Sequence, residues 1–325
     1  MRHVTETAHR RNLVGLCLLV LLIVAAGLLL KKSYHLSIIG HAAILGIAAL
    51  GMFVLFGYTG QISIGQAAFF GVGAYVSALL VMRLNVPPPL ALVASVAASA
   101  CLGWLVSRPL LRLETNYLAL ATLAFGLICF NLFAQMKDLT GGLDPGIVGM
   151  PPFRLFGYEL DGSRPMYWLV MAFLVVALLA TFNIVHSRTG RALRALRSSE
   201  VAASGLGVDT VRYKVAAFTF ASALTGLAGS LFAFSQGAFS ASTFGIGLSI
   251  EILVMVVIGS ISSPWGTLFG AFFVSLLPTV LQDYEQYRMM IFGAILTVIM
   301  IFMPDGLGKA VFALLRRGVT RGGAR

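Results

Sequence analysis

Charge is scarce in this chain of 325 residues, because Asp, Glu, Lys and Arg together make up only 11% of it. A typical soluble domain has about a quarter of its residues charged. Hydrophobic residues account for 58% of the chain, and its mean hydropathy is +0.92. This balance excludes a soluble globular domain and indicates that most of the chain lies in lipid.

Paired cysteines and catalytic constellations are missing as well. The 3 cysteines, Cys17, Cys101 and Cys129, each stand alone in an apolar run, so their spacing predicts neither a disulfide framework nor a zinc site. No nucleophile stands beside a base, and no His and carboxylate residues share the spacing of metal ligands. We therefore expect that the protein is not an enzyme and that it binds no metal.

A nucleotide-binding loop is also lacking. A Walker A loop reads GxxxxGK followed by Ser or Thr, because its backbone amides and its lysine cradle phosphate. In this chain Gly308-Lys309 is followed by Ala310, and Met303 stands where the first glycine should be. The chain is therefore expected to bind no cofactor itself. If its activity uses ATP, then ATP and Mg²⁺ bind to a separate polypeptide.

Long apolar runs are what the sequence has in abundance. A bilayer core of about 30 Å is spanned by about 20 residues of helix. Ten runs reach or approach this length, with ends placed to within several residues and the eighth being the weakest: residues 13–30, 38–56, 62–82, 90–106, 117–135, 166–185, 215–235, 248–261, 265–281 and 289–303. The first run is too long for the apolar part of a signal peptide. The sequence predicts an all-α polytopic membrane protein of about ten transmembrane helices, with a single transmembrane domain over residues 1–325.

The distribution of Lys and Arg predicts the orientation of these helices, because cations are enriched on the cytoplasmic side. If the amino terminus is cytoplasmic, the inner segments hold most of the cations: Arg2, Arg10, Arg11, Arg108, Arg112, Arg188, Arg191, Arg194, Arg197, Arg212, Lys214, Lys309, Arg316, Arg317, Arg321 and Arg325. The outer segments balance their cations with acids. We therefore expect both termini in the cytoplasm. The net charge of +11 indicates contact with anionic lipid rather than with nucleic acid.

Two predicted loops are long, an outer loop at residues 137–165 and an inner loop at residues 186–214. The apolar residues of the inner loop recur at helical spacings: Leu193, Leu196, Ala203 and Leu206. Ser198 or Ser199 can cap a second helical piece that starts with Glu200 and ends at Gly205 or Gly207. A row of arginines fits a helix on anionic lipid. The small residues at 202–205 instead favour a surface that a partner protein approaches closely.

The same loop resembles a known family. Glu200, Ala202, Ala203 and Gly205 resemble the EAA-type cytoplasmic loop with which bacterial ABC importer permeases dock on their ATPase. The flanking runs GRALRALR at 190–197, GLGV at 205–208 and YKVAAF at 213–218 are similar to the branched-chain amino acid permease family, LivM type. Further matching blocks are GYTGQISIGQAAF at 57–69, YLALATLAF at 117–125 and LTGG at 139–142. Together the blocks extend from about residue 57 to residue 270.

This resemblance implies the ABC importer permease fold and the function of a membrane subunit that forms half of a translocation path for leucine, isoleucine, valine or related amino acids. The implied partners are two ATPase subunits, a homologous second permease subunit and an extracytoplasmic substrate-binding protein, at the bacterial cytoplasmic (inner) membrane. ATP hydrolysis then belongs to the ATPase subunits. The resemblance places ATPase docking on the inner loop, with these candidate residues: Arg191, Arg194, Arg197, Glu200, Ala202, Ala203, Gly205 and Gly207.

Two other functions stay open. A urea or short-amide importer is the alternative within the same family. A self-sufficient secondary transporter or channel would need several intramembrane acids or a polar pore, and Glu251 is the only carboxylate well inside a predicted span.

Polar and small residues inside the apolar runs are candidates for the translocation path: Gly60, Gln61, Ser63, Gln66, Asn131, Thr140, Gly141, Gly142 and Glu251. Each has a structural alternative. The glycines can serve close helix packing, and Gln61 and Gln66 can form structural hydrogen bonds. Glu251 can cap a helix that begins at Ser249 near the outer interface. Asn131 is expected to be a buried hydrogen-bonding residue.

Two further features bear on the fold. The segments 57–74 and 226–245 are rich in small residues and would be entered from opposite sides of the membrane, which indicates an inverted repeat. The chain also departs from the family pattern, since Pro145 is additional and Ser260 and Ser262 stand where the family has glycines. If those glycines adopt positive φ angles, serine there would cost stability or shift the loop.

Overall fold

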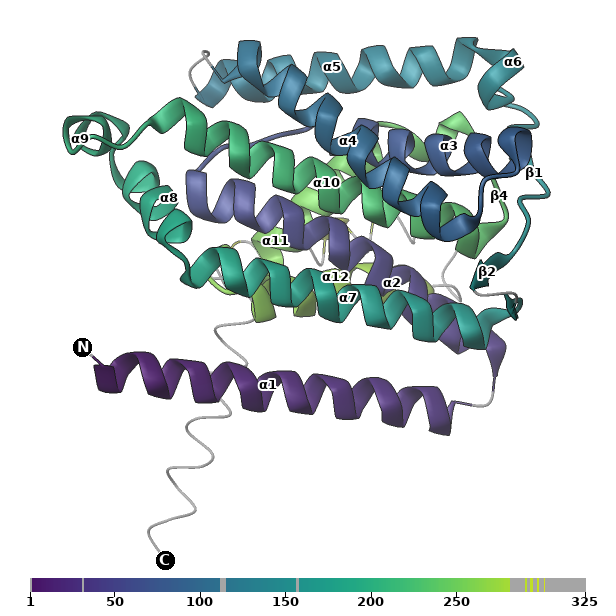
Figure 1. Ribbon diagram of the computed structural model, residues 1–325, viewed down its shortest axis with the longest axis horizontal. Coiled ribbons are helices and arrows are strands. Elements are labelled where there is room, and N and C mark those ends of the chain that lie inside the picture. The colour runs from purple at the N-terminus through teal and green to yellow at the C-terminus, as the bar shows by residue number, and fades with distance from the viewer. Residues whose placement is uncertain are drawn as a thin grey trace, which may run out of the picture.

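The computed structural model describes residues 2–30, 32–111, 115–155 and 158–280, together with residues 290, 293, 294, 297 and 301. Long helices run side by side as one bundle, and α1 (Arg2–Leu29) lies along its outside (Figure 1). The other long helices are α2 (Ser33–Met52), α3 (Gln66–Leu84), α4 (Pro88–Leu110), α5 (Thr115–Gln135), α7 (Ser163–His186), α10 (Thr210–Gln236), α11 (Ile246–Gly259) and α12 (Pro264–Val280). The predicted helical class is confirmed.

Six described helices are long and apolar enough to cross a membrane by length and composition: Ser33–Tyr58, Gln66–Leu84, Pro88–Leu110, Tyr117–Gln135, Ser163–His186 and Thr210–Gln236. The apolar helices Gly15–Leu29 and α11 are shorter. The tenth predicted run, residues 289–303, falls mostly on residues outside the described part of the chain. The count of about ten transmembrane helices therefore stays a prediction.

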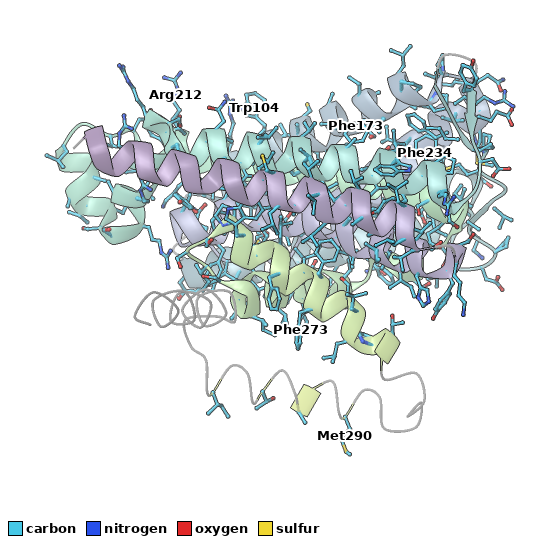
Figure 2. The ribbon with its side chains drawn as sticks, turned by 90° about the horizontal axis from the view of Figure 1, so that it is seen from below. Trp104, Phe173, Arg212, Phe234, Phe273 and Met290 are labelled. Atoms are coloured by element: carbon cyan, nitrogen blue, oxygen red, sulfur yellow. The ribbon has the colours of Figure 1, made fainter. Side chains whose placement is uncertain are left out.

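Shorter elements occupy the two ends of the bundle. α8 (Arg188–Ser198) and α9 (Glu200–Gly205) lie at the end where α1 begins, and α6 (Lys137–Thr140) lies at the opposite end (Figure 1). Figure 2 shows Arg212, just beyond α9, and Phe234, near the far end of α10, correspondingly far apart. The segments predicted as inner and outer loops thus lie at opposite ends.

Four short strands lie at the α6 end of the bundle. β1 (Ile147–Val148) pairs antiparallel with β4 (Ala238–Phe239), so that Ile147 stands opposite Phe239. β2 (Phe153–Leu155) and β3 (Tyr158–Leu160) form a separate antiparallel pair. A 3₁₀ turn, η2 (Ala241–Phe244), follows β4 and packs against α3 and α5.

The helix α10 lies at the centre of the bundle, where it packs against α2, α3 and α4. Glycines make these contacts close. A Cβ atom added at Gly229 would meet the Phe70 carbonyl oxygen on α3, and one added at Gly73 would meet the backbone of Gly226 on α10. Small residues at such crossings are typical of helix packing in membranes, where backbones approach closely.

The packing also relates the two halves of the bundle. In each half a long helix, α2 or α10, is followed by a stretch without α-helix and then by two further helices. The helices α3 and α4 pack against α10, whereas α11 and α12 pack against α2. This exchange of partners is compatible with an inverted repeat, and the repeat itself stays a prediction.

The third predicted span, residues 62–82, corresponds to α3, but its helix begins a few residues later than the apolar run. Residues 60–65 are not helical, and α3 begins at Gln66. The preceding helix ends in a π-helical stretch, η1 (Phe53–Tyr58), which extends α2. Single π-helical turns inside α-helices are frequent at functional sites, so this break belongs with the candidate site.

Candidate functional site

The predicted inner loop folds as two capped helices that are separated at Ser199. The Ser187 hydroxyl accepts a hydrogen bond from the Gly190 amide at 3.3 Å and caps α8. The Ser199 hydroxyl accepts one from the Ala202 amide at 3.2 Å and caps α9, which starts with Glu200 and ends at Gly205. The prediction of two helical pieces is confirmed, with Ser199 rather than Ser198 as the cap.

The apolar residues of these helices do not all face the bundle. Leu193, Leu196 and Ala203 are buried, as their spacing predicts, but Leu206 is 83% exposed. Leu206 does not share the buried face, because the chain leaves the helix at Ser199 and the helical phase of α8 does not continue to residue 206. Ala203 was predicted to contact a partner, and its burial removes it from that surface.

An ion pair ties α9 to the first turns of α10. The Lys214 Nζ atom donates to both carboxylate oxygens of Glu200, at 2.6 and 2.7 Å. The Lys214 side chain is only 10% exposed, whereas that of Glu200 is 52% exposed. Glu200, a candidate docking residue, is therefore a partly exposed group that also fixes the loop to α10.

Two of the predicted docking arginines contact the chain itself. The Arg197 Nη1 atom donates a hydrogen bond to the Gly57 carbonyl oxygen in η1. The Arg194 guanidinium lies over the Tyr58 ring, 5.7 Å from its centroid, which is within the range of a cation–π interaction. These side chains connect α8 to the end of the helix α2–η1.

The exposed surface of α9 is small and apolar. Val201 is 82% exposed, and Ala202, Gly205 and Leu206 are exposed beside it in sequence. We call these four residues the α9 face. Arg191 and Gly207 are also exposed, and Gly207 has a φ angle of +81°. The sequence predicts the two small residues of this face but not Val201, whose exposure depends on the direction of the short helix α9.

We expect the Glu200–Lys214 pair to contribute measurably to stability. Glu200→Gln and Lys214→Met should each destabilise the protein, and the double variant should be more stable than the sum of the single effects predicts. Because Glu200 is half exposed, we expect a coupling free energy of about 1 kcal/mol. Thermal unfolding of the four proteins in detergent would measure it, and strictly additive effects would contradict the pair.

The break between η1 and α3 forms a buried polar junction together with the first two residues of α3, residues 59–67. Ile64 N donates to Thr122 Oγ1 of α5 at 3.0 Å, and Ala67 N donates to Ser249 Oγ of α11 at 2.9 Å. Thr225 Oγ1 of α10 donates to Gln66 Oε1 at 3.0 Å. A non-helical backbone at membrane depth requires such partners. The junction is therefore joined to three neighbouring helices by side-chain hydrogen bonds.

The predicted path residues in this junction are buried rather than exposed to an open channel. Gln61, Ser63 and Gln66 are at most 3% exposed. Gln61 N donates to Thr59 Oγ1 at 3.3 Å, and Gly60 has a φ angle of +73°, which favours glycine. The assignment of these residues to the translocation path stays a prediction.

The remaining path candidates do not join this junction. Thr140 donates to the Phe133 carbonyl at 2.6 Å, and Gly142 accepts from Ala241 N at 3.2 Å, at the opposite end of the bundle. Gly141 packs against the backbone of Gly146, which follows a cis Asp144–Pro145 bond. These residues connect α6 to the segment that follows β4.

Two expectations for single residues are wrong. Asn131 was expected to be buried, but it is exposed on α5, where its Nδ2 atom donates to the Leu127 carbonyl at 2.9 Å. Glu251 was expected to cap a helix that begins at Ser249. The helix α11 instead begins at Ile246, so Glu251 lies inside it and is half-buried.

The serine at the family's glycine position fits without strain. Ser260 has a φ angle of 161°, which is close to the extended conformation that any residue adopts. Its hydroxyl accepts a hydrogen bond from Ser262 N at 3.3 Å and lies 3.0 Å from the Ser262 hydroxyl. The expected cost of serine in this loop is therefore absent, because the loop needs no positive φ at residue 260.

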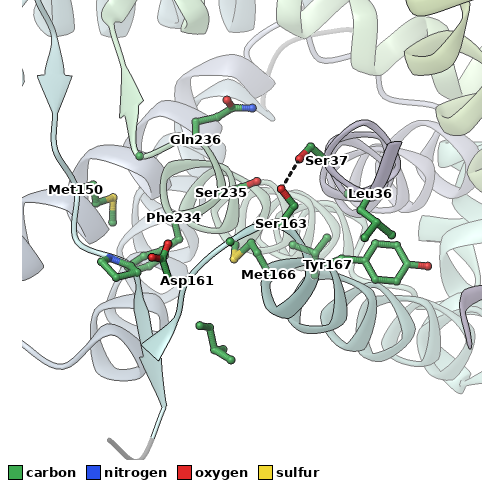
Figure 3. A pocket seen from close by; sticks show the side chains of 16 residues that line it. Leu36, Ser37, Met150, Asp161, Ser163, Met166, Tyr167, Phe234, Ser235 and Gln236 are labelled. Carbon is green, nitrogen blue, oxygen red and sulfur yellow. Dashed lines mark hydrogen bonds between the residues drawn. The ribbon is translucent and has the colours of Figure 1, made fainter. Parts of the chain in front are cut away.

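A cavity of about 290 Å³ lies at the α6 end, between the start of α2, the start of α7 and the end of α10 (Figure 3). Ser37 and Ser163 are hydrogen-bonded at its wall at 3.0 Å, and Met166 and Phe234 supply apolar lining. None of the predicted path residues lines it. Among the described residues, no cluster of three or more His, Cys, Asp or Glu residues is suited to a metal ion.

Comparison with known proteins gives a consistent result. Residues 34–304 match the family described as branched-chain amino acid transport system / permease component. The permease protein LivM of Salmonella typhimurium is 31% identical over 284 residues, which cover 80% of this chain and 67% of that protein. LivM of Escherichia coli K12 is 32% identical over 286 residues, with the same coverage.

The LivH permease of Escherichia coli K12 is more distant, at 24% identity over 282 residues that cover 80% of this chain and 90% of LivH. No solved structure matches the chain. The family match covers most of the sequence, including both helices of the α8–α9 loop and the buried junction. The chain therefore belongs to the family of branched-chain amino acid transport system permease components, and it is of the LivM type.

Proposed function

We propose that this chain is the LivM-type membrane subunit of an ATP-driven ABC importer for leucine, isoleucine, valine or related hydrophobic amino acids. It would pair with a homologous permease subunit, dock on two ATPase subunits and receive its substrate from an extracytoplasmic binding protein. The names of its LivM and LivH relatives, which are permeases of branched-chain amino acid transport, support this assignment.

The observation that carries the docking assignment is the α9 face. Val201 and Leu206 are more than four-fifths exposed, although α9 lies at the end of the bundle rather than along its apolar sides (Figure 1). Exposed apolar residues rimmed by polar ones mark protein contact sites. The small residues Ala202 and Gly205 leave room for a partner backbone beside them.

Charge supports a cytoplasmic position for this end. The α8–α9 end holds Arg188, Arg191, Arg194, Arg197 and Arg212. The opposite end mixes cations with acids, as in the exposed pair Arg154–Glu159. Because cations are enriched on the cytoplasmic side, we assign the α8–α9 end and the amino terminus to the cytoplasm of a bacterium, with the bundle in its inner membrane.

The loop is also placed to transmit motion. α8 follows α7 directly, and the Glu200–Lys214 pair joins α9 to α10. Since α10 packs against α2, α3 and α4, a displacement of the α9 face by closure of the ATPase subunits would tilt the central helix. Such tilting would open the path alternately to the two sides, and specificity would lie mainly with the binding protein.

The test is uptake by the complete transporter in proteoliposomes. We expect radiolabelled leucine to accumulate only when ATP and the binding protein are present. Unlabelled isoleucine and valine should inhibit this accumulation by competition. Radiolabelled urea should not accumulate. An ATPase subunit without its Walker A lysine is the control for energy coupling.

Other outcomes would redirect the assignment. ATP-dependent uptake of urea without uptake of leucine would favour the urea or short-amide importer. Uptake of leucine by this chain without any ATPase subunit would exclude the ABC assignment and favour a secondary transporter.

A further inference from the structure

Among the last carbonyl groups of α2–η1, the Gly57 carbonyl accepts its hydrogen bond from outside this helix. The final carbonyls of a helix have no partner within the helix and need one from outside. At this helix end, Thr59 N and Gly60 N donate to the Leu55 and Phe56 carbonyls. The next amide along the chain that donates, Gln61 N, bonds to the Thr59 hydroxyl instead. The Gly57 carbonyl is therefore left for another element.

Arg197 supplies that partner from the α8–α9 loop. Its guanidinium donates to the Gly57 carbonyl, 140 residues away in sequence. A cation is favourable at this position, because the carboxyl end of a helix carries partial negative charge. The Arg197 stem passes over Gly60, where an added Cβ atom would lie 3.6 Å from Arg197 Cγ.

A second contact lies one turn earlier on α8. The Arg194 guanidinium stands over the Tyr58 ring, so two successive arginines on one face of α8 hold the same helix end. This helix end also meets the loop between α11 and α12, since a Cβ atom at Gly57 would approach the Ile261 carbonyl at 2.6 Å. The carboxyl end of η1 thus contacts both α8 and that loop.

The buried junction begins at this helix end. Its hydrogen bonds reach α5 through Thr122, α10 through Thr225 and α11 through Ser249. A displacement of α8 therefore reaches the interior of the bundle by two routes. One route is the chain connection through α7 and α10, and the other passes from Arg197 to η1 and the junction.

We propose that Arg197 is a positioning residue that couples the α8–α9 loop to the junction between α2 and α3, as a helix cap supplied by a distant part of the same chain. This inference rests on the proposed transport function. In this arrangement Arg197 is not an ATPase contact. It makes the η1 end follow α8, so that movement of the loop changes the path in the bundle.

The test uses the complete transporter in lipid nanodiscs and proteoliposomes with Arg197→Ala, Arg197→Lys and, as a matched control on the same helix, Arg188→Ala. For Arg197→Ala we expect leucine uptake to fall at least fivefold, with ATP hydrolysis and ATPase copurification changed by less than twofold. Arg197→Lys keeps the charge and a donor and should recover at least half of the uptake. Arg188→Ala should remain within twofold of the wild type.

A second readout follows the junction itself. Amide hydrogen exchange over residues 57–66 should change on addition of ATP in the wild-type complex and in Arg188→Ala, and this ATP-dependent change should be lost in Arg197→Ala. A group with a merely structural role would alter exchange equally with and without ATP.

Three results would overturn the inference. Unchanged uptake in Arg197→Ala would show that the cap is dispensable. Loss of ATPase copurification together with uptake would make Arg197 a docking residue. Failure of both Arg197→Ala and Arg197→Lys to assemble would assign it a purely structural role. A different result, the absence of ATP-dependent leucine uptake in the wild-type complex, would contradict the proposed function itself. It would be seen without any Arg197 variant and is therefore distinguishable from failure of the cap.

Discussion

Replacing Val201 and Leu206 with aspartate is expected to release the ATPase subunits from the membrane complex and to abolish leucine uptake, while the helix bundle stays folded. Both side chains are more than four-fifths exposed in the isolated chain. Burial of one aliphatic side chain contributes about 1.5–3 kcal/mol. Losing two such contacts would weaken the complex by about 3–6 kcal/mol, or roughly 10²- to 10⁴-fold in affinity.

Copurification of the ATPase through a tag on this chain measures docking, and radiolabelled leucine uptake measures transport. Tyr158→Asp is the matched control for docking, because Tyr158 is 80% exposed but lies on β3 at the opposite end of the bundle. The double variant should retain the gel-filtration profile of the wild-type membrane subunits. Normal ATPase copurification with the double variant would exclude the α9 face as the docking surface.

The features of this loop that the sequence predicts are local ones. Ser199 caps α9 through a hydrogen bond to an amide three residues away, and Leu193 and Leu196 are buried because they share one face of a single short helix. Such relations depend only on helix geometry and on side-chain chemistry, so they can be recognised without the fold.

The differences between sequence and structure have an equally specific origin. Leu206 is spaced from Leu193 and Leu196 as if on one helix, but the chain leaves the helix at Ser199, so Leu206 does not share their buried face. The start of α3 was placed too early because Ile62 and Ile64 keep the hydropathy of the junction high, although residues 60–65 are not helical. A hydropathy average therefore cannot locate a break that polar partners stabilise from neighbouring helices.

The side-chain contacts that join the α8–α9 loop and the junction to other helices could not be predicted from the sequence. Glu200 was singled out for docking, but its partner Lys214 lies on the next helix. Arg197 reaches a backbone carbonyl, and a carbonyl has no sequence signature. Likewise Ser249 and Thr225 are ordinary helix residues in the sequence, and they become partners of the junction only because α10 and α11 pack against α3.

Gly229→Ala is expected to destabilise the bundle by about 1–3 kcal/mol, the range typical of overpacked cores. The added methyl group would collide with the Phe70 carbonyl oxygen and lie 3.1 Å from the Phe70 Cα atom. Both are backbone atoms, so a change of side-chain rotamer cannot relieve the contact and α3 must move away from α10. The helix α3 also carries Gln66, at the end of the junction, and uptake should therefore fall together with stability.

Gly40→Ala is the matched control, because it is the same substitution in a transmembrane helix. Gly40 lies in α2, and a Cβ atom added there would meet nothing within 4 Å. Alanine favours the helical conformation over glycine by about 1 kcal/mol, so Gly40→Ala should be neutral or slightly stabilising. Thermal unfolding midpoints of both variants in detergent would compare them directly. Equal midpoints would contradict close packing of α3 on α10 and imply that these helices are farther apart in the membrane.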